Sequence, residues 1–202
     1  MSGAFPISTS KFSTMGIQSI QPTLISKSIS GKKLSRTIDA QRWAFTISII
    51  TSTRATAYGE LMAFIVKQRS GKENFTIIPP ELEDARGNIS GTVLVNGVHA
   101  VGDTTIAVDD MTGSLKAGDF IKFAHDKIYM VVADVTADGS NEATTIIEPP
   151  LTTALADDSS VTYDNVPFTV HLTNDMQEFG VVGVDKDGNH LYKFEFDVEE
   201  TL

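Results

Sequence analysis

The sequence contains no cysteine, and acidic residues outnumber basic ones. Without cysteine the chain can form neither disulfides nor thiolate metal sites, and it has no cysteine nucleophile. The formal net charge is −10, with 16 basic and 26 acidic residues. Clustered Lys and Arg are needed to neutralise the phosphates of duplex nucleic acid, so we expect no specific nucleic-acid binding.

Long hydrophobic runs are also missing. No window approaches the roughly 20 apolar residues that a membrane-spanning helix requires, so we expect no membrane insertion. The first 20 residues scatter Phe and Ile among Ser, Thr and Gly, which differs from a secretory signal. We therefore expect the chain to fold in the cytoplasm where it is made. At 41% hydrophobic and 21% charged residues, the composition is that of an ordinary globular protein of one domain or two small ones.

Residues 3–40 are rich in Ser, Thr, Gly and Lys, with isolated apolar residues between them. This pattern predicts an extended arm and a long exposed hairpin that turns at residues 30–33. An arm of this kind often needs a partner to cover it. Residues 42–49 then alternate large apolar side chains with smaller or polar ones, which predicts a half-buried strand.

One helix is predicted over residues 55–70. Residues 51–53 offer N-caps, Lys67 and Arg69 suit the negative end of the helix dipole, and Gly71 can adopt the left-handed conformation that ends a helix. A strand is expected at residues 75–78. The apolar positions that recur at helical spacing are Tyr58, Leu61, Phe64 and Ile65.

After residue 91 the chain changes to short β runs separated by turn signals such as Asn96-Gly97 and Gly118-Asp119. Their regular spacing predicts a small OB-like barrel of about 70 residues. Longer strands return from residue 161. The last of them places aromatic and apolar residues on one face and charged residues on the other. The five short runs lie at residues 92–95, 104–108, 120–123, 127–132 and 144–147.

We therefore predict a mainly β protein with one α-helix. A β-sandwich or barrel core domain is built from both chain ends, residues 1–88 and 162–202. The small OB-like barrel, residues 89–161, is inserted between them.

Motifs for catalysis or metal binding are weak, and we expect neither an enzyme nor a cofactor or metal site. The four histidines are far apart in sequence. Residues 185–189 superficially resemble the start of a calcium loop, but the later oxygens are misplaced, so we predict a hairpin turn with Asp-Gly at its tip. The aromatic residues are expected in cores rather than as stacking platforms. Three acidic pairs are predicted to lie in solvated turns: Asp109-Asp110, Asp157-Asp158 and Glu199-Glu200.

The charge is unevenly distributed along the chain. Residues 1–42 carry six bases and one acid, whereas residues 174–202 carry eight acids and two lysines. This asymmetry either serves solubility alone or provides complementary faces between neighbouring subunits.

The order of segments along the chain is informative. The extended N-terminal hairpin is followed in the core domain by residues 41–47, 67–71, 75–79, 167–168 and 194–202. The inserted barrel contributes residues 115–123, 127–131 and 147–151. These motifs are architectural and include no catalytic residue. In this order they resemble the distal tail protein family of long-tailed (siphophage-type) bacteriophages, in the form with an inserted OB-like barrel.

The resemblance implies a structural virion protein that forms a hexameric ring at the junction of the tail tube and the tail tip or baseplate. Its implied partners are other copies of itself, the tail tube protein and the tail-tip hub proteins. DNA would pass through the open lumen without being gripped. The implied location is the phage tail, assembled in the host cytoplasm. Five residues are predicted to lie at the subunit interface: Phe5, Phe12, Lys32, Lys33 and Arg36.

Two other functions stay open at this point. The inserted barrel could serve as a carbohydrate-binding module that contacts glycans on the host surface. The chain could instead be another tail-tube or baseplate component, since those proteins share stacked β rings but usually lack the inserted barrel.

Overall fold

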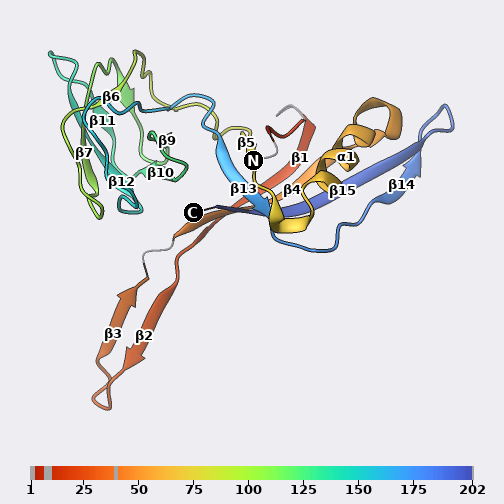
Figure 1. Cartoon of the computed structure of the whole chain (residues 1–202), viewed down its shortest axis with the longest axis horizontal. Coiled ribbons are helices and arrows are strands. Elements are labelled where there is room, and N and C mark those ends of the chain that lie inside the picture. The colour runs from red at the N-terminus through yellow and green to blue at the C-terminus, as the bar shows by residue number, and fades with distance from the viewer. Residues whose placement is uncertain (1–2, 7–10, 39–40, 202) are drawn as a thin grey trace. The chain divides into compact units, whose positions relative to one another are not determined.

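The computed structural model describes residues 3–6, 11–38 and 41–201 (Figure 1). It is mainly β with one helix, which confirms the predicted fold class. The chain divides into two compact units. The first unit comprises Met1–Ser19, Trp43–Pro80 and Pro167–Thr201, and the second comprises Ile20–Arg42 and Glu81–Val166. Compared with the predicted domains, residues 20–42 group with the inserted segment rather than with the two chain ends.

A six-stranded sheet forms the framework of the first unit. Strand β15 pairs antiparallel with β4, β13 and β14. The predicted extended arm is partly wrong, because its residues 12–20 form the strand beside β4. In spatial order the strands are β1 (Phe12–Ile20), β4 (Arg42–Thr53), β15 (His190–Glu200), β13 (Phe168–Leu172) and β5 (Phe75–Ile77), with β14 (Gly180–Val184) also paired to β15.

The core of this sheet follows from alternation along the two long strands. Phe45 and Ile47 of β4 and Phe194 and Phe196 of β15 are buried, while Glu195 between the last two is exposed. This confirms the predicted strands, because every second residue of a strand points to the same face.

The helical segment begins with a π-helical turn, Arg54–Tyr58, and continues as α1 (Gly59–Lys67). Leu61 and Ile65 of α1 are buried, and the Phe64 ring packs edge-on against Phe75 of β5 at 5.2 Å. The predicted N-cap is only partly right, because Thr53 holds that position without a side-chain capping bond.

The prediction that Gly71 ends the helix in a left-handed conformation is wrong. Arg69 and Ser70 adopt the left-handed backbone instead, with φ of 52° and 62°. Gly71 has a different role, because a Cβ at this position would lie 2.7 Å from the carbonyl oxygen of Leu172 in β13. It therefore permits the short 3-10 turn Ser70–Lys72 to lie close to the sheet.

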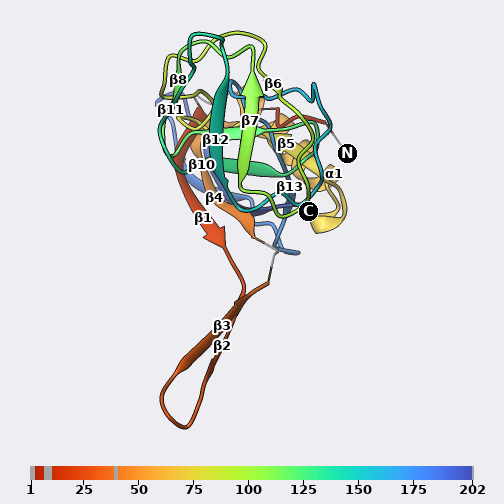
Figure 2. The same cartoon turned by 90° about the vertical axis from the view of Figure 1, so that its left-hand side faces the viewer.

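The second unit contains the predicted small barrel (Figure 2). Its two outer strands, β6 and β9, both bridge to residues 160–162, which links the edges of the sheet. Ile106, Tyr129 and Ile147 are among its fully buried core residues. In spatial order the sheet contains β6 (Leu94–Val95), β7 (Thr105–Asp109), β12 (Ala143–Glu148), β10 (Ile128–Val131) and β9 (Phe120–Lys122); β8 (Ser114–Leu115) pairs separately with β11 (Val135–Thr136).

The second unit also includes the hairpin formed by β2 (Thr23–Lys27) and β3 (Lys33–Thr37). Its turn is closed by a bond from the Ser28 N–H to the carbonyl of Lys32. The predicted exposed hairpin is thus confirmed, but its turn lies at residues 28–32 rather than 30–33, because Lys33 already pairs in β3. No helix in the described part of the chain is long and apolar enough to cross a membrane.

Candidate functional site

The β2–β3 hairpin is a two-stranded ribbon whose side chains lie in solvent. All five residues of β2 are exposed, and so are residues 33–36 of β3. An isolated two-stranded hairpin is marginally stable in water, because it has no third layer in which to bury its apolar side chains. The hairpin is therefore a candidate surface for a partner.

Cross-strand register shows how the two faces of the hairpin differ. Leu24 lies opposite Arg36, and Ser26 lies opposite Leu34, so these four residues share one face. On the other face Lys27 lies directly opposite Lys33. Like charges in directly opposed positions repel, so this end of the hairpin favours a partner that supplies carboxylates.

Exposed apolar side chains accompany this positive charge. Leu24 and Ile25 are 60% and 58% exposed, and Leu34 is 55% exposed. Ile29 lies at the turn and is fully exposed. Burial of an Ile or Leu side chain contributes roughly 1.5–3 kcal/mol, so these positions would supply most of the binding energy if a partner covered the hairpin.

The five predicted interface residues lie in different settings. Lys32, Lys33 and Arg36 are exposed on the hairpin. Phe5 and Phe12 are half-buried and pack against each other, with ring centroids 5.9 Å apart. Phe5 also contacts three further aromatic rings of its own unit, those of Phe64, Phe75 and Phe196. The hairpin residues are thus available to a partner, whereas the two phenylalanines already contribute to an intrachain cluster; an interface role for all five stays a prediction.

A second exposed surface lies on strand β14 of the first unit. Within the described residues β14 pairs with β15 alone, so its other edge has no neighbouring strand. A bulge between Val181 and Gly183 interrupts its pairing with β15. Val181, Val182 and Val184 are each more than half exposed. Unpaired strand edges with apolar side chains are templates for pairing with another chain.

Acidic residues surround this edge strand. Residues 175–187 contain four acids and one lysine, a formal charge of −3. Asp185 accepts bonds from the side-chain amide and backbone N–H of Asn189 and from the backbone N–H of Asp187. These hydrogen bonds lower the pKa of Asp185, the side-chain amide of Asn189 contributing most. The same geometry confirms the predicted hairpin turn at residues 185–189.

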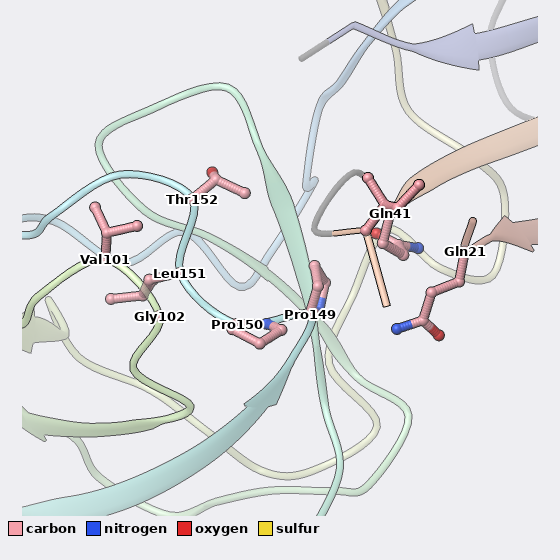
Figure 3. A pocket seen from close by; sticks show the side chains of 9 residues that line it. Gln21, Gln41, Val101, Gly102, Pro149, Pro150, Leu151 and Thr152 are labelled. Atoms are coloured by element: carbon pink, nitrogen blue, oxygen red, sulfur yellow. The ribbon is translucent and has the colours of Figure 1, made fainter. Parts of the chain in front are cut away.

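A pocket of about 170 Å³ lies within the second unit (Figure 3). Of the described residues that line it, none is ionisable, so it offers no acid–base pair. The side-chain oxygen of Gln41 accepts a bond of 2.8 Å from the Lys127 ammonium, and both residues are buried. The lining residues are Gln21, Ile38, Gln41, Val101, Gly102 and Pro149–Thr152.

The described residues contain no group of three His, Asp or Glu side chains placed to hold a metal ion. Three of the four histidines, His99, His125 and His171, have local partners. His99 Nε2 accepts a bond from the Ala107 N–H, and the His125 ring packs edge-on against Tyr129 at 5.5 Å. Burial is the main cause that lowers the pKa of His125, and the nearby Lys122 contributes.

One buried carboxylate contradicts the prediction made for the acidic pairs. Glu200 is fully buried in β15, where Oε2 accepts a bond of 3.1 Å from the backbone N–H of Trp43. Glu200 is two residues after Val198 and four after Phe196, so it lies on the same inward face of β15. The alternation of the strand could therefore have predicted its burial. Asp109 is half-buried at the end of β7, and only Asp157-Asp158 forms the expected exposed turn.

Comparison of the sequence with protein-family models and with curated proteins finds no match.

Proposed function

We propose that this chain is a structural virion protein whose copies form a ring at the junction of a phage tail tube and its tail tip. The resemblance of its segment order to the distal tail protein family motivates the proposal. The observation that carries it is the exposed β2–β3 hairpin, which combines apolar side chains with like-charged residues and is not covered by the described residues of its own chain.

The physical reason for assembly is the attraction between the basic hairpin of one copy and the acidic remainder of another. Between residues 23 and 37 it carries four bases and no acid, a charge of +4. The rest of the chain is strongly acidic, since the whole sequence has a net charge of −10. A second copy therefore presents a surface of opposite sign, and complementary potentials accelerate encounter and select register.

The proposed ring has six copies, and the tail tube protein and the tail-tip hub are its neighbours along the tail. DNA passes through its lumen. A predominantly acidic protein repels phosphate, so transit proceeds without binding.

Charge reversal on the hairpin tests this function. We expect the triple variant Lys32→Glu, Lys33→Glu, Arg36→Glu to shift the oligomer toward monomer, because it removes the attraction to acidic neighbours. The mass is measured by light scattering, and any ring is imaged by electron microscopy. An unchanged oligomer would refute the role of the hairpin in assembly.

A matched control is available in the first unit. Lys67, Arg69 and Lys72 are also two lysines and one arginine, and all three are exposed. Reversing them changes the net charge by the same amount, so the control separates local charge on the hairpin from total charge. We expect this control to assemble like the unmodified chain.

A further inference from the structure

We propose that the β2–β3 hairpin of one copy binds along the free edge of β14 in a neighbouring copy. This inference rests on the proposed function and identifies the surface that receives the hairpin. Both partners are five-residue strands with exposed apolar side chains, and each has an edge that no other described strand of its own chain occupies. Strand addition at such an edge joins the backbones of two chains through hydrogen bonds.

Charge distinguishes β14 from the β1 edge of the same sheet, and the lack of a neighbouring described segment distinguishes it from the β5 edge. Strand β1 has no charged residue between Phe12 and Ile20. The edge at β5 is occupied by the N-terminal segment, because the Phe5 N–H bonds to the Thr76 carbonyl at 2.8 Å. Strand β14 is both free and flanked by four acids and one lysine in residues 175–187, a charge of −3 that opposes the +4 charge of the hairpin.

One glycine of β14 gives further support. Gly183 lies at the bulge in the pairing with β15, a common setting for glycine in a strand. Gly180 lies outside the bulge and lacks a positive φ, and a Cβ there would have no neighbouring atom within 4 Å. Glycine within a strand can also mark a site where another backbone approaches closely, as an added strand would.

The side chains on the two surfaces also complement each other. Val181, Val182 and Val184 can cover Leu24 and Leu34, and the flanking carboxylates can relieve the repulsion between Lys27 and Lys33. The hairpin and the β14 edge are different surfaces, so each copy can receive one neighbour and reach another. Such a contact is heterologous, and it closes into a ring where the rotation between copies permits.

The absence of cysteine makes a direct test straightforward. Single-cysteine variants Ile25→Cys and Ser35→Cys, one on each strand of the hairpin, are each mixed with Val182→Cys and treated with a short bis-maleimide. A cross-link between two different variants can form only between copies. We expect both hairpin variants to cross-link to Val182→Cys. Val98→Cys, at a 79% exposed position in the barrel, is the control and should not cross-link to either.

Charge exchange provides a second readout. Lys33→Glu and Glu178→Lys, both at exposed positions, should each weaken association about two- to fivefold per contact, as expected for solvent-exposed ion pairs. The double variant should recover association, since the opposed signs are restored.

The outcomes separate this inference from the proposed function. Oligomers that form without a cross-link from the hairpin to β14, or that cross-link equally to Val98→Cys, overturn the edge assignment and leave assembly intact. Exclusively monomeric protein, with no cross-link at high concentration, contradicts both.

Discussion

Substitution of Gly71 by Ala tests the close approach between the end of the helical segment and β13. The added Cβ would lie 2.7 Å from the Leu172 carbonyl oxygen and 3.5 Å from the His171 ring. The first contact is with backbone, so relief requires β13 or the 3-10 turn to move. Overpacking of this kind costs roughly 1–3 kcal/mol. Alanine also lowers the conformational entropy of the unfolded chain, which stabilises the folded state by about 0.4–1 kcal/mol, since Gly71 has an ordinary φ that Ala tolerates.

The net expectation is a loss of about 1–2 kcal/mol from the free energy of unfolding of the first unit. With a urea dependence of about 1–3 kcal/mol per molar, the midpoint should fall by roughly 0.5–1 M. Trp43 is the single tryptophan and is buried in β4, so its fluorescence reports the first unit alone. Repeating the titration at several protein concentrations separates unfolding from dissociation.

Gly16→Ala is the matched control for this measurement. Gly16 lies in β1, has no positive φ, and has no atom within 4 Å of an added Cβ. We expect its midpoint to be unchanged or slightly raised. A Gly71→Ala midpoint equal to that of the unmodified chain, or an equal loss in Gly16→Ala, would refute the proposed steric role of Gly71.

Two further predictions concern the second unit and the aromatic core of the first. Gly87→Ala places a Cβ directly against the Ser114 carbonyl oxygen, so the barrel should lose hydrogen-exchange protection while the Trp43 transition is retained. A shift of both signals would contradict this expectation, because it would show that the two units unfold together. Burial, with a contribution from Tyr192, raises the pKa of Tyr58 to about 12. The folded state therefore holds this proton more tightly than the unfolded state, and stability of the first unit should fall as the pH rises from about 10 toward 12. Tyr58→Phe should show a smaller fall, and an identical pH profile in the two proteins would contradict this reasoning.

The long strands and the barrel strands could be predicted from sequence because their burial follows a simple period. In β15 the alternation of Phe194, Glu195 and Phe196 directly encodes an inner and an outer face. Strands β8 and β11 could not be predicted in this way, since two residues are too few to establish a period. Their pairing depends on tertiary contacts of the barrel.

The errors at Gly71 and Glu200 share a physical origin. Glycine is usually associated with positive φ at a helix end, but here it is needed because another backbone lies nearby. A glutamate near the end of the described chain is usually solvated, but strand parity directs Glu200 inward, where it accepts a bond from Trp43. In both cases a contact distant in sequence overrides the average behaviour of the residue type.

Of the two candidate surfaces, one could be predicted from a local sequence pattern and the other depends on tertiary structure. The hairpin was predictable, because a long polar segment with isolated apolar residues and a turn signal already indicates exposed strands. The free edge of β14 was not predictable, because the alternation of apolar and polar residues in one strand does not specify which strands lie beside it in the sheet. Once the edge is known, the acids near residue 180 can be placed beside it, and the proposed contact would bring them to the basic hairpin of a second copy. The cross-link between two different variants is the decisive measurement, because it can form only between two copies.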